Sequence, residues 1–164
     1  MALIHQAGWH MHLADLIGPE AVIASLKVKT KKQLLQELSA RTARLTGLQD
    51  RYIFDTLLQR ERLGSTGLGQ GIAIPHGKFV GLKRITGLCA RLAEPVDFDA
   101  VDGQPVDIVF LLLAPEGAGA DHLKALARIS RLLREGHAVD KLRASRDAAA
   151  LYAVLTEGAT SHAA

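Results

Sequence analysis

The sequence predicts an α/β protein in which a mixed sheet of about five strands is flanked by helices. Three observations lead to this prediction. Apolar side chains recur at helical spacing between residues 31 and 47, residues 106–113 form an apolar run typical of a strand buried on both faces, and helix and strand patterns alternate along the chain. No repeat or long linker divides the 164 residues, so we expect a single domain.

Two helices are predicted in the first half of the chain. Thr30 and Gln33 have the spacing of a capping box, and Gly47 is suited to end the helix that they begin. The side chains expected on the buried face of this helix are Leu34, Leu35, Leu38, Thr42 and Leu45. A second helix should run from Gln49 to Leu63 and end at Gly64.

A short strand is expected directly before a histidine. Residues 72–74 are apolar and too few for a helix, and Pro75 keeps the residue before it extended. His76 should therefore leave the end of a strand.

The remaining strands follow from apolar runs and turn residues. Residues 85–92 predict a strand, and residues 106–113 predict the central one. Residues 95–98 are a candidate for a short edge strand, followed by a turn at Asp102-Gly103. Residues 22–28 are a second candidate for an edge.

Three helices are predicted in the last third of the chain. Asp121 is suited to cap the first, which should end at Gly136. Its apolar face would be formed by Leu123, Leu126, Ile129, Leu132 and Leu133. Two shorter helices should cover residues 138–144 and 147–156. We expect a domain over residues 13–156, between a flexible segment at 1–12 and a disordered tail at 157–164.

Composition narrows the class of protein. The chain is 48% hydrophobic and 23% charged, and its longest apolar run, residues 108–114, is too short for a membrane helix. A single cysteine, Cys89, and the lack of a secretory signal favour the cytoplasm. A net charge of +3 is too mild for a nucleic-acid stripe. His5, His10 and His12 match no tight ligand spacing, so no metal is expected.

The segment around His76 has the composition of a phosphoryl-carrying loop. Imidazole is both a nucleophile and a leaving group near neutral pH, so phosphohistidine can accept and pass on a phosphoryl group. The negative charge that arrives needs donors, which backbone N–H groups of glycines and the hydroxyl of Thr66 can supply. The glycine candidates are Gly67, Gly69, Gly71 and Gly77.

Two residues outside the loop are candidates to assist. Arg60 precedes it and could neutralise charge in the transfer, or it could interact only with the end of its own helix. His122 could hydrogen-bond the His76 site, or it could be an ordinary residue near a helix start. His76 itself has a structural alternative, with the glycines forming only a turn. The loop matches neither a Walker motif nor a dinucleotide fingerprint.

A longer signature contains these residues. Its residues are Glu61, then after six residues Leu68-Gly69, and after two more Ile72-Ala73-Ile74-Pro75-His76-Gly77. In this signature the chain resembles the phosphohistidine motif of phosphotransferase-system enzyme IIA proteins of the fructose/mannitol superfamily. Residues 60–78, 98–107 and 121–123 most resemble the nitrogen-regulatory branch, and the resemblance extends over residues 13–156.

The resemblance implies both fold and function. It implies a phosphotransferase/anion-transport-like sandwich in which His76 accepts a phosphoryl group from an HPr-like carrier, Arg60 stabilises it and His122 is the second active-site histidine. It implies no metal or organic cofactor. The phosphorylation state would regulate partners in potassium transport or nitrogen metabolism. Two alternatives stay open: a sugar-specific enzyme IIA that passes phosphate to a IIB component, and a non-catalytic module that binds anions or partners.

Overall fold

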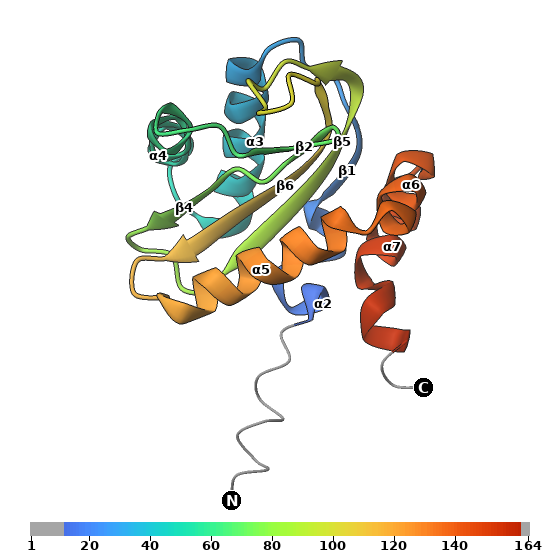
Figure 1. Ribbon diagram of the computed structural model, residues 1–164. Coiled ribbons are helices and arrows are strands. Elements are labelled where there is room, and N and C mark those ends of the chain that lie inside the picture. Colours follow the sequence, from blue (N-terminus) through green and yellow to red (C-terminus); the bar gives the residue numbers. More distant parts are fainter. Residues whose placement is uncertain (1–11, 162–164) are drawn as a thin grey trace, which may run out of the picture.

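A mixed sheet lies between two layers of helices in the computed structural model, which describes residues 12–161 (Figure 1). The predicted α/β class is therefore confirmed. The helices α3 and α4 cover one face of the sheet, and α2, α5, α6 and α7 lie on the other. Their bounds are Leu13–Leu16 for α2, Lys31–Thr46 for α3, Asp50–Arg62 for α4, Ala120–Arg134 for α5, Gly136–Ala144 for α6 and Ala148–Ser161 for α7, with a 3-10 turn at Pro19–Ala21.

The sheet has six strands in the order β1-β5-β6-β3-β2, with β4 also paired to β6. Strand β6 is antiparallel to β5 and parallel to β3 and β4, so it is the centre of the sheet, as predicted. The bounds are Val22–Leu26 for β1, Gly67–Gly69 for β2, Ile72–Ala73 for β3, His76–Phe79 for β4, Thr86–Val96 for β5 and Val106–Pro115 for β6.

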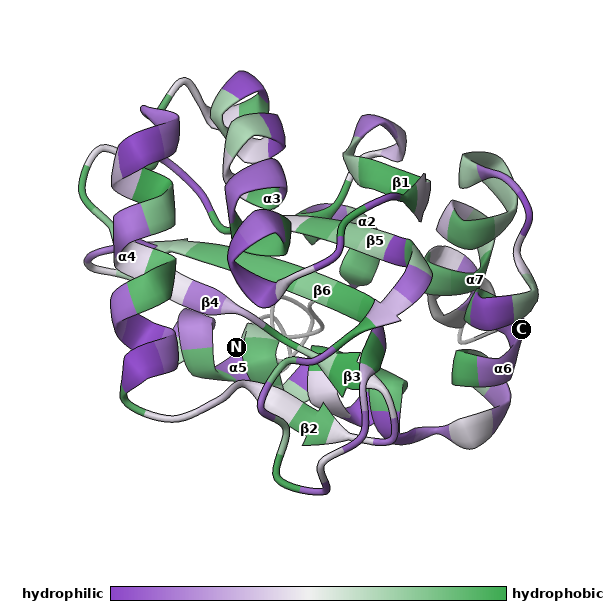
Figure 2. Cartoon of the chain, turned by 90° about the horizontal axis from the view of Figure 1, so that it is seen from above, coloured by the Kyte–Doolittle hydropathy of each residue, from purple (hydrophilic) through white to green (hydrophobic). Residues whose placement is uncertain are grey.

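The core forms where β5 and β6 cross the middle of the molecule (Figure 2). Every residue from Ile108 to Ala114 is fully buried, because helices cover both faces of the strand. Cys89 on β5 is also fully buried, and burial raises the pKa of its thiol to about 12. This cysteine is core filler, as its apolar neighbourhood predicts.

Helix α3 begins and ends where its capping residues predict. The Thr30 side chain accepts a hydrogen bond from the Gln33 backbone N–H at 3.1 Å. The Gln33 side chain accepts from the Lys29 N–H rather than from the Thr30 N–H, so the reciprocal bond is shifted by one residue. Gly47 ends the helix in the left-handed conformation, with φ of 78°, which glycine adopts without a side-chain clash.

Three strand predictions are corrected. Residues 67–69, expected as a loop, form β2, and His76 begins β4 rather than leaving a strand end. Residues 95–98 are not a separate edge strand, because β5 continues through an irregularity to Val96, which pairs with Val106. This gives six strands where about five were expected.

The start of α5 and the elements after it also differ from the prediction. Gly119 occupies the N-cap position, and Asp121 lies inside the helix rather than capping it. Leu123 is 67% exposed, so it does not belong to the buried face of α5. Gly136 begins α6 instead of ending α5. Helix α7 continues to Ser161, past the predicted end at residue 156.

The described part of the chain contains no helix that is both long enough and apolar enough to span a bilayer. His5 and His10 of the predicted histidine cluster lie outside the described residues. The third member, His12, precedes α2, where its backbone N–H donates to the Asp15 carboxylate at 3.2 Å.

Candidate functional site

The alternation of side chains along β4 directs His76 toward α5. Successive residues of a strand point to opposite faces of the sheet. A Cβ on Gly77 would lie 3.2 Å from Thr56 of α4, so this position faces α4. His76 therefore points to the other face, where α5 carries His122, and the two ring centroids are 5.7 Å apart with the planes inclined by 44°.

One hydrogen bond determines which tautomer the neutral His76 ring adopts. Its Nδ1 lies 2.7 Å from the carbonyl oxygen of Ile74. A carbonyl oxygen can only accept, so Nδ1 carries the proton of the neutral ring. The lone pair of the neutral imidazole is consequently on Nε2, which is the nitrogen able to act as a nucleophile.

The surroundings of His76 favour this neutral ring. Burial lowers its pKa below the usual 6.5, and the neighbouring Arg60 charge lowers it further, whereas the Ile74 carbonyl and the Glu61 carboxylate raise it. The net shift of the pKa is downward. At neutral pH the ring is therefore uncharged and its Nε2 lone pair is available.

His122 is the second histidine of the site. It lies in the first turn of α5 and is 6% exposed, and its Nδ1 has no hydrogen-bond partner among the residues that the structure describes. Burial lowers the pKa of His122, and repulsion from His76 in its protonated form and from the Lys78 charge lowers it further. A buried polar atom without a partner costs free energy, so this nitrogen is suited to a group that enters from outside.

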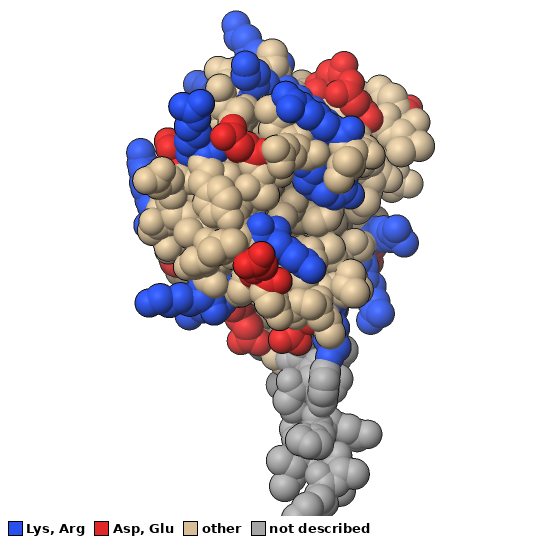
Figure 3. Space-filling view, turned by 90° about the vertical axis from the view of Figure 1, so that its left-hand side faces the viewer, with Lys and Arg blue, Asp and Glu red and all other residues tan. Residues whose placement is uncertain are grey.

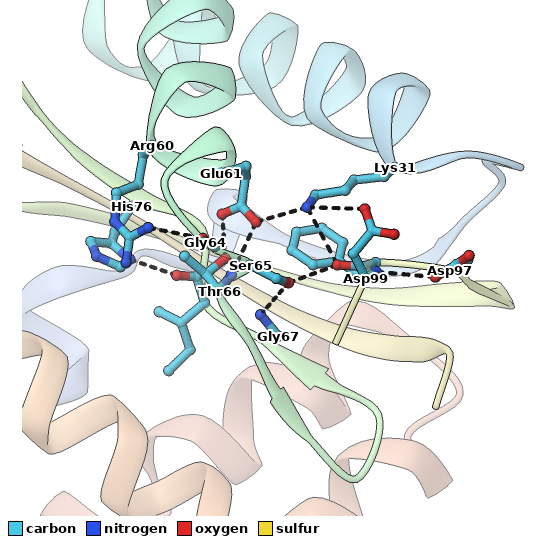
Figure 4. A network of polar contacts seen from close by, with 12 residues as sticks. Lys31, Arg60, Glu61, Gly64, Ser65, Thr66, Gly67, His76, Asp97 and Asp99 are labelled. Carbon is cyan, nitrogen blue, oxygen red and sulfur yellow. Dashed lines mark hydrogen bonds and ion pairs between the residues drawn. The ribbon is translucent and has the colours of Figure 1, made fainter. Parts of the chain in front are cut away.

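Arg60 supplies positive charge beside His76. It lies in the last turn of α4, and its Nη1 donates to the Gly64 carbonyl oxygen at 2.9 Å. Figure 4 shows the guanidinium next to the His76 ring. Within residues 12–161 the bond to Gly64 is the one hydrogen bond of the Arg60 side chain, so other N–H donors of the planar group are left for an anion. The structure thus brings together the predicted residues His76, His122 and Arg60.

Two predicted donors are already engaged by neighbouring side chains. The Thr66 N–H donates to the Glu61 carboxylate at 3.0 Å, and the Thr66 hydroxyl donates to the other carboxylate oxygen. The Gly67 N–H donates to the Ser65 hydroxyl at 3.1 Å. These groups organise the turn after α4, and the structure does not present them as free phosphate donors.

Gly69 and Gly71 lie away from the histidine pair. Ile72 pairs with Ile108 and His76 with Leu112, four residues further along β6. Four residues of strand separate these positions by about 13 Å. Both glycines have positive φ, 99° and 82°, which suits them to the tight β2–β3 hairpin. The predicted phosphate-binding role is therefore not supported for either of them.

The fourth predicted glycine, Gly77, is adjacent to His76 but serves packing. Its missing side chain allows α4 to approach β4, because a Cβ would crowd both Thr56 and the Phe79 ring. Phe79 is completely buried, whereas Val80 is 61% and Leu68 42% exposed. Phe79 therefore cannot contact a partner protein, whereas Val80 and Leu68 are accessible to one.

Charged side chains are spread over the side of the molecule formed by α4 and β4. Figure 3 shows this face, on which Lys and Arg side chains and a few Asp and Glu side chains stand among uncharged ones, near the middle as well as at the margin. The face thus combines uncharged area with charges of both signs.

Sequence reasoning missed the part that Glu61 plays. This carboxylate is buried near the end of α4 and forms an ion pair with Lys31 at 3.1 Å, in addition to its bonds with Thr66. Lys31 also lies 4.4 Å from the centre of the Phe98 ring. The only signal in the sequence is that Glu61 opens the phosphohistidine motif, and a motif position alone does not say what its side chain contacts.

Comparison with known proteins identifies the class. The family model described as phosphoenolpyruvate-dependent sugar phosphotransferase system, EIIA 2, matches residues 15–158. The chain belongs to this family, whose members take part in phosphoryl transfer between carriers.

The relatives define the branch. A nitrogen regulatory protein of Bradyrhizobium diazoefficiens is 63% identical over 145 residues, covering 88% of this chain and 95% of the relative. The crystal structure of nitrogen regulatory protein IIA-Ntr from Neisseria meningitidis matches with a TM-score of 0.84 at 38% identity, covering 88% of this chain and 99% of that one. A fructose-specific EIIABC component of Bacillus subtilis is 35% identical over 124 residues, covering 75% of this chain but 20% of that protein. Within the family, the chain is a member of the nitrogen-regulatory branch.

Proposed function

We propose that this protein is a cytoplasmic phosphocarrier that accepts a phosphoryl group on Nε2 of His76 from the phosphohistidine of an HPr-like carrier. Its phosphorylation state then regulates partners in potassium transport or nitrogen metabolism. The observation that supports the acceptor atom best is the 2.7 Å hydrogen bond between His76 Nδ1 and the Ile74 carbonyl oxygen, which leaves the lone pair on Nε2.

The transfer itself exchanges one N–P bond for another. The Nε2 lone pair of His76 attacks phosphorus while the N–P bond of the donor breaks, and that bonding pair stays on the donor nitrogen. The loose, metaphosphate-like transition state needs positioning and positive charge more than covalent help. In this proposal Arg60 stabilises the charge on the phosphoryl oxygens, and His122 offers its buried Nδ1–H to one of them.

The labelling reaction tests the proposal directly. We expect incubation with phosphoenolpyruvate, enzyme I and the HPr-like carrier to add one acid-labile phosphate to the protein, detected by mass spectrometry of the intact chain. His76→Ala should abolish the addition. The matched control is His137→Ala, a histidine of α6 outside the site, which should label like the unmodified protein. Labelling of His76→Ala, or no labelling of the unmodified protein, would contradict the proposal.

A second candidate function is that of a sugar-specific enzyme IIA. The observation in its favour is the 35% identity to the fructose-specific EIIABC component. It predicts rapid onward transfer from phosphorylated His76 to a IIB protein, whereas the regulatory proposal predicts no efficient transfer. The decay of the phosphorylated protein after addition of a purified fructose-type IIB distinguishes the two. A module that only binds anions would take up no covalent phosphate in the labelling reaction.

A further inference from the structure

A buried ion pair lies behind the site, away from the reacting nitrogen. The Glu61 side chain is 2% exposed, and its Oε1 is 3.1 Å from Lys31 Nζ. Lys31 also donates to the Phe98 carbonyl oxygen at 3.3 Å and lies 3.8 Å from the Asp99 carboxylate. A carboxylate this deeply buried is costly unless its oxygens are paired and hydrogen-bonded, and here they are.

The same carboxylate holds both donors of one residue. Thr66 is 5% exposed, and its N–H and hydroxyl donate to the two different oxygens of Glu61. Two bonds to one rigid group fix the orientation of the Thr66 peptide. A hydrogen bond to a charged acceptor is also stronger than one between neutral groups.

Backbone contacts continue from Thr66 to the imidazole. The Thr66 carbonyl oxygen accepts from the Ile74 N–H at 3.0 Å, and the Ile74 carbonyl oxygen accepts from His76 Nδ1 at 2.7 Å. The contacts therefore form one series from Glu61 through Thr66 and Ile74 to His76. Figure 4 shows the ion pair, the Thr66 turn and the imidazole in this order.

Glu61 is also adjacent in α4 to Arg60, the residue that supplies positive charge to the site. Arg60 precedes it in the same helical turn and is held by the Gly64 carbonyl oxygen, two residues before Thr66. The turn that Glu61 holds in place thus contains the Gly64 carbonyl, which binds Arg60, and Thr66, which is hydrogen-bonded to Ile74.

We infer that Glu61 is a positioning residue: by fixing Thr66 it holds the Ile74 carbonyl where it selects the Nδ1–H tautomer of His76 and keeps Nε2 free to react. Lys31 neutralises the buried carboxylate without approaching the reacting atom. The inference deepens the proposed function and rests on it, because it explains how the acceptor nitrogen is prepared. Glu61 itself touches neither the phosphoryl group nor the carrier.

The test compares Glu61→Gln with a matched control. Gln keeps the size of the side chain and one acceptor oxygen, but it removes the charge and the second acceptor. The control, Glu157→Gln, makes the same change at an exposed carboxylate paired with Lys141 at 3.3 Å. Two properties are measured: the tautomer of His76 by ¹⁵N NMR, and the kinetics of phosphoryl uptake from the phosphorylated HPr-like carrier.

We expect Glu61→Gln to shift part of the His76 population to the Nε2–H tautomer. It should lower kcat for phosphoryl uptake by about 10- to 100-fold, as a small misplacement of a reacting group does. The KM for the carrier should stay unchanged, because the Glu61 side chain is buried and cannot contact a partner. Glu157→Gln should change none of these properties.

A milder variant keeps the test decisive if Glu61→Gln does not fold. Thr66→Val removes only the hydroxyl bond to Glu61 and should shift the tautomer and kcat in the same direction by a smaller factor. Its control is Thr156→Val, which removes a hydroxyl bond to the Tyr152 carbonyl oxygen at 2.9 Å in α7.

A folded Glu61→Gln protein with the original tautomer and the original kcat would overturn the inference, as would a rise in KM alone. The two proposals can fail separately. If the unmodified protein takes up no phosphate, the proposed function fails, whereas the tautomer comparison still decides whether Glu61 positions His76.

Discussion

A single hydrogen bond determines which nitrogen of His76 can react. The Ile74 carbonyl oxygen accepts from Nδ1, so the neutral ring presents its lone pair at Nε2. Burial and the Arg60 charge together lower the pKa of this ring, although the hydrogen bond to Ile74 and the Glu61 carboxylate raise it. The residue is therefore prepared to act as a nucleophile before a partner arrives.

The lowered pKa values predict how stability depends on pH. Folded His76 and His122 bind protons less readily than their unfolded counterparts. As the pH falls through about 6.5, the unfolded chain takes up more protons, so the free energy of unfolding should decrease. Above that pH both states are neutral at these positions, so the two histidines no longer make stability change with pH.

Urea unfolding between about pH 7 and pH 5 measures this dependence. The double variant His76→Gln/His122→Gln has no imidazole in the site and should lose part of the decrease in stability on acidification. His137→Gln serves as the control and should retain the full decrease. An equal decrease in the double variant and the unmodified protein would show that the two rings are not responsible.

At the scale of elements, the close approach of α4 to β4 holds Arg60 beside His76. Gly77 permits this approach, since a Cβ there would lie 3.2 Å from Thr56 Cγ2 and 3.3 Å from the Phe79 ring. Phe79 in turn packs edge-on against Tyr52 of α4, with ring centroids 5.4 Å apart. The glycine is thus part of the helix–strand contact.

Gly77→Ala should separate α4 from β4 by a small amount. We expect it to lower the free energy of unfolding by about 1–3 kcal/mol, the usual cost of overpacking, and to slow phosphoryl uptake. Chemical denaturation and the labelling rate measure the two effects. Gly117→Ala, where nothing lies within 4 Å of the added methyl group, is the matched control. If both variants behave alike, the tight contact at Gly77 has no energetic role.

Helices and strands could be predicted from the sequence where neighbouring residues determine their position. Thr30 and Gly47 mark the ends of α3, and the apolar run of residues 106–113 marks the central strand, because capping and two-sided burial leave clear patterns. Strand β2 was not predictable, since Gly67-Leu68-Gly69 has low strand propensity and pairs only through its tertiary partner β3. Gly136 was mistaken for a helix end because glycine is also compatible with a first helical position.

At the scale of the whole molecule, the fold brings together groups that the sequence separates. Arg60 comes from α4, His76 from β4 and His122 from α5, which lies on the opposite face of the sheet from α4. The glycine-rich segment indicated His76, the sequence left Arg60 and His122 as candidates with structural alternatives, and the resemblance to enzyme IIA proteins gave those two a role in the site. Neither the burial of Glu61 nor its pairing with Lys31 could be predicted, because both depend on how α3, α4 and the turn after α4 pack together.

If Nε2 of His76 carries the phosphoryl group, as we propose, ³¹P–¹⁵N NMR of the phosphorylated protein will identify that nitrogen. We predict one phosphohistidine signal in which phosphorus couples to Nε2 of His76, with Nδ1 still protonated toward the Ile74 carbonyl. A phosphorus coupled to Nδ1 of His76, or to either nitrogen of His122, would show that Nε2 of His76 is not the acceptor.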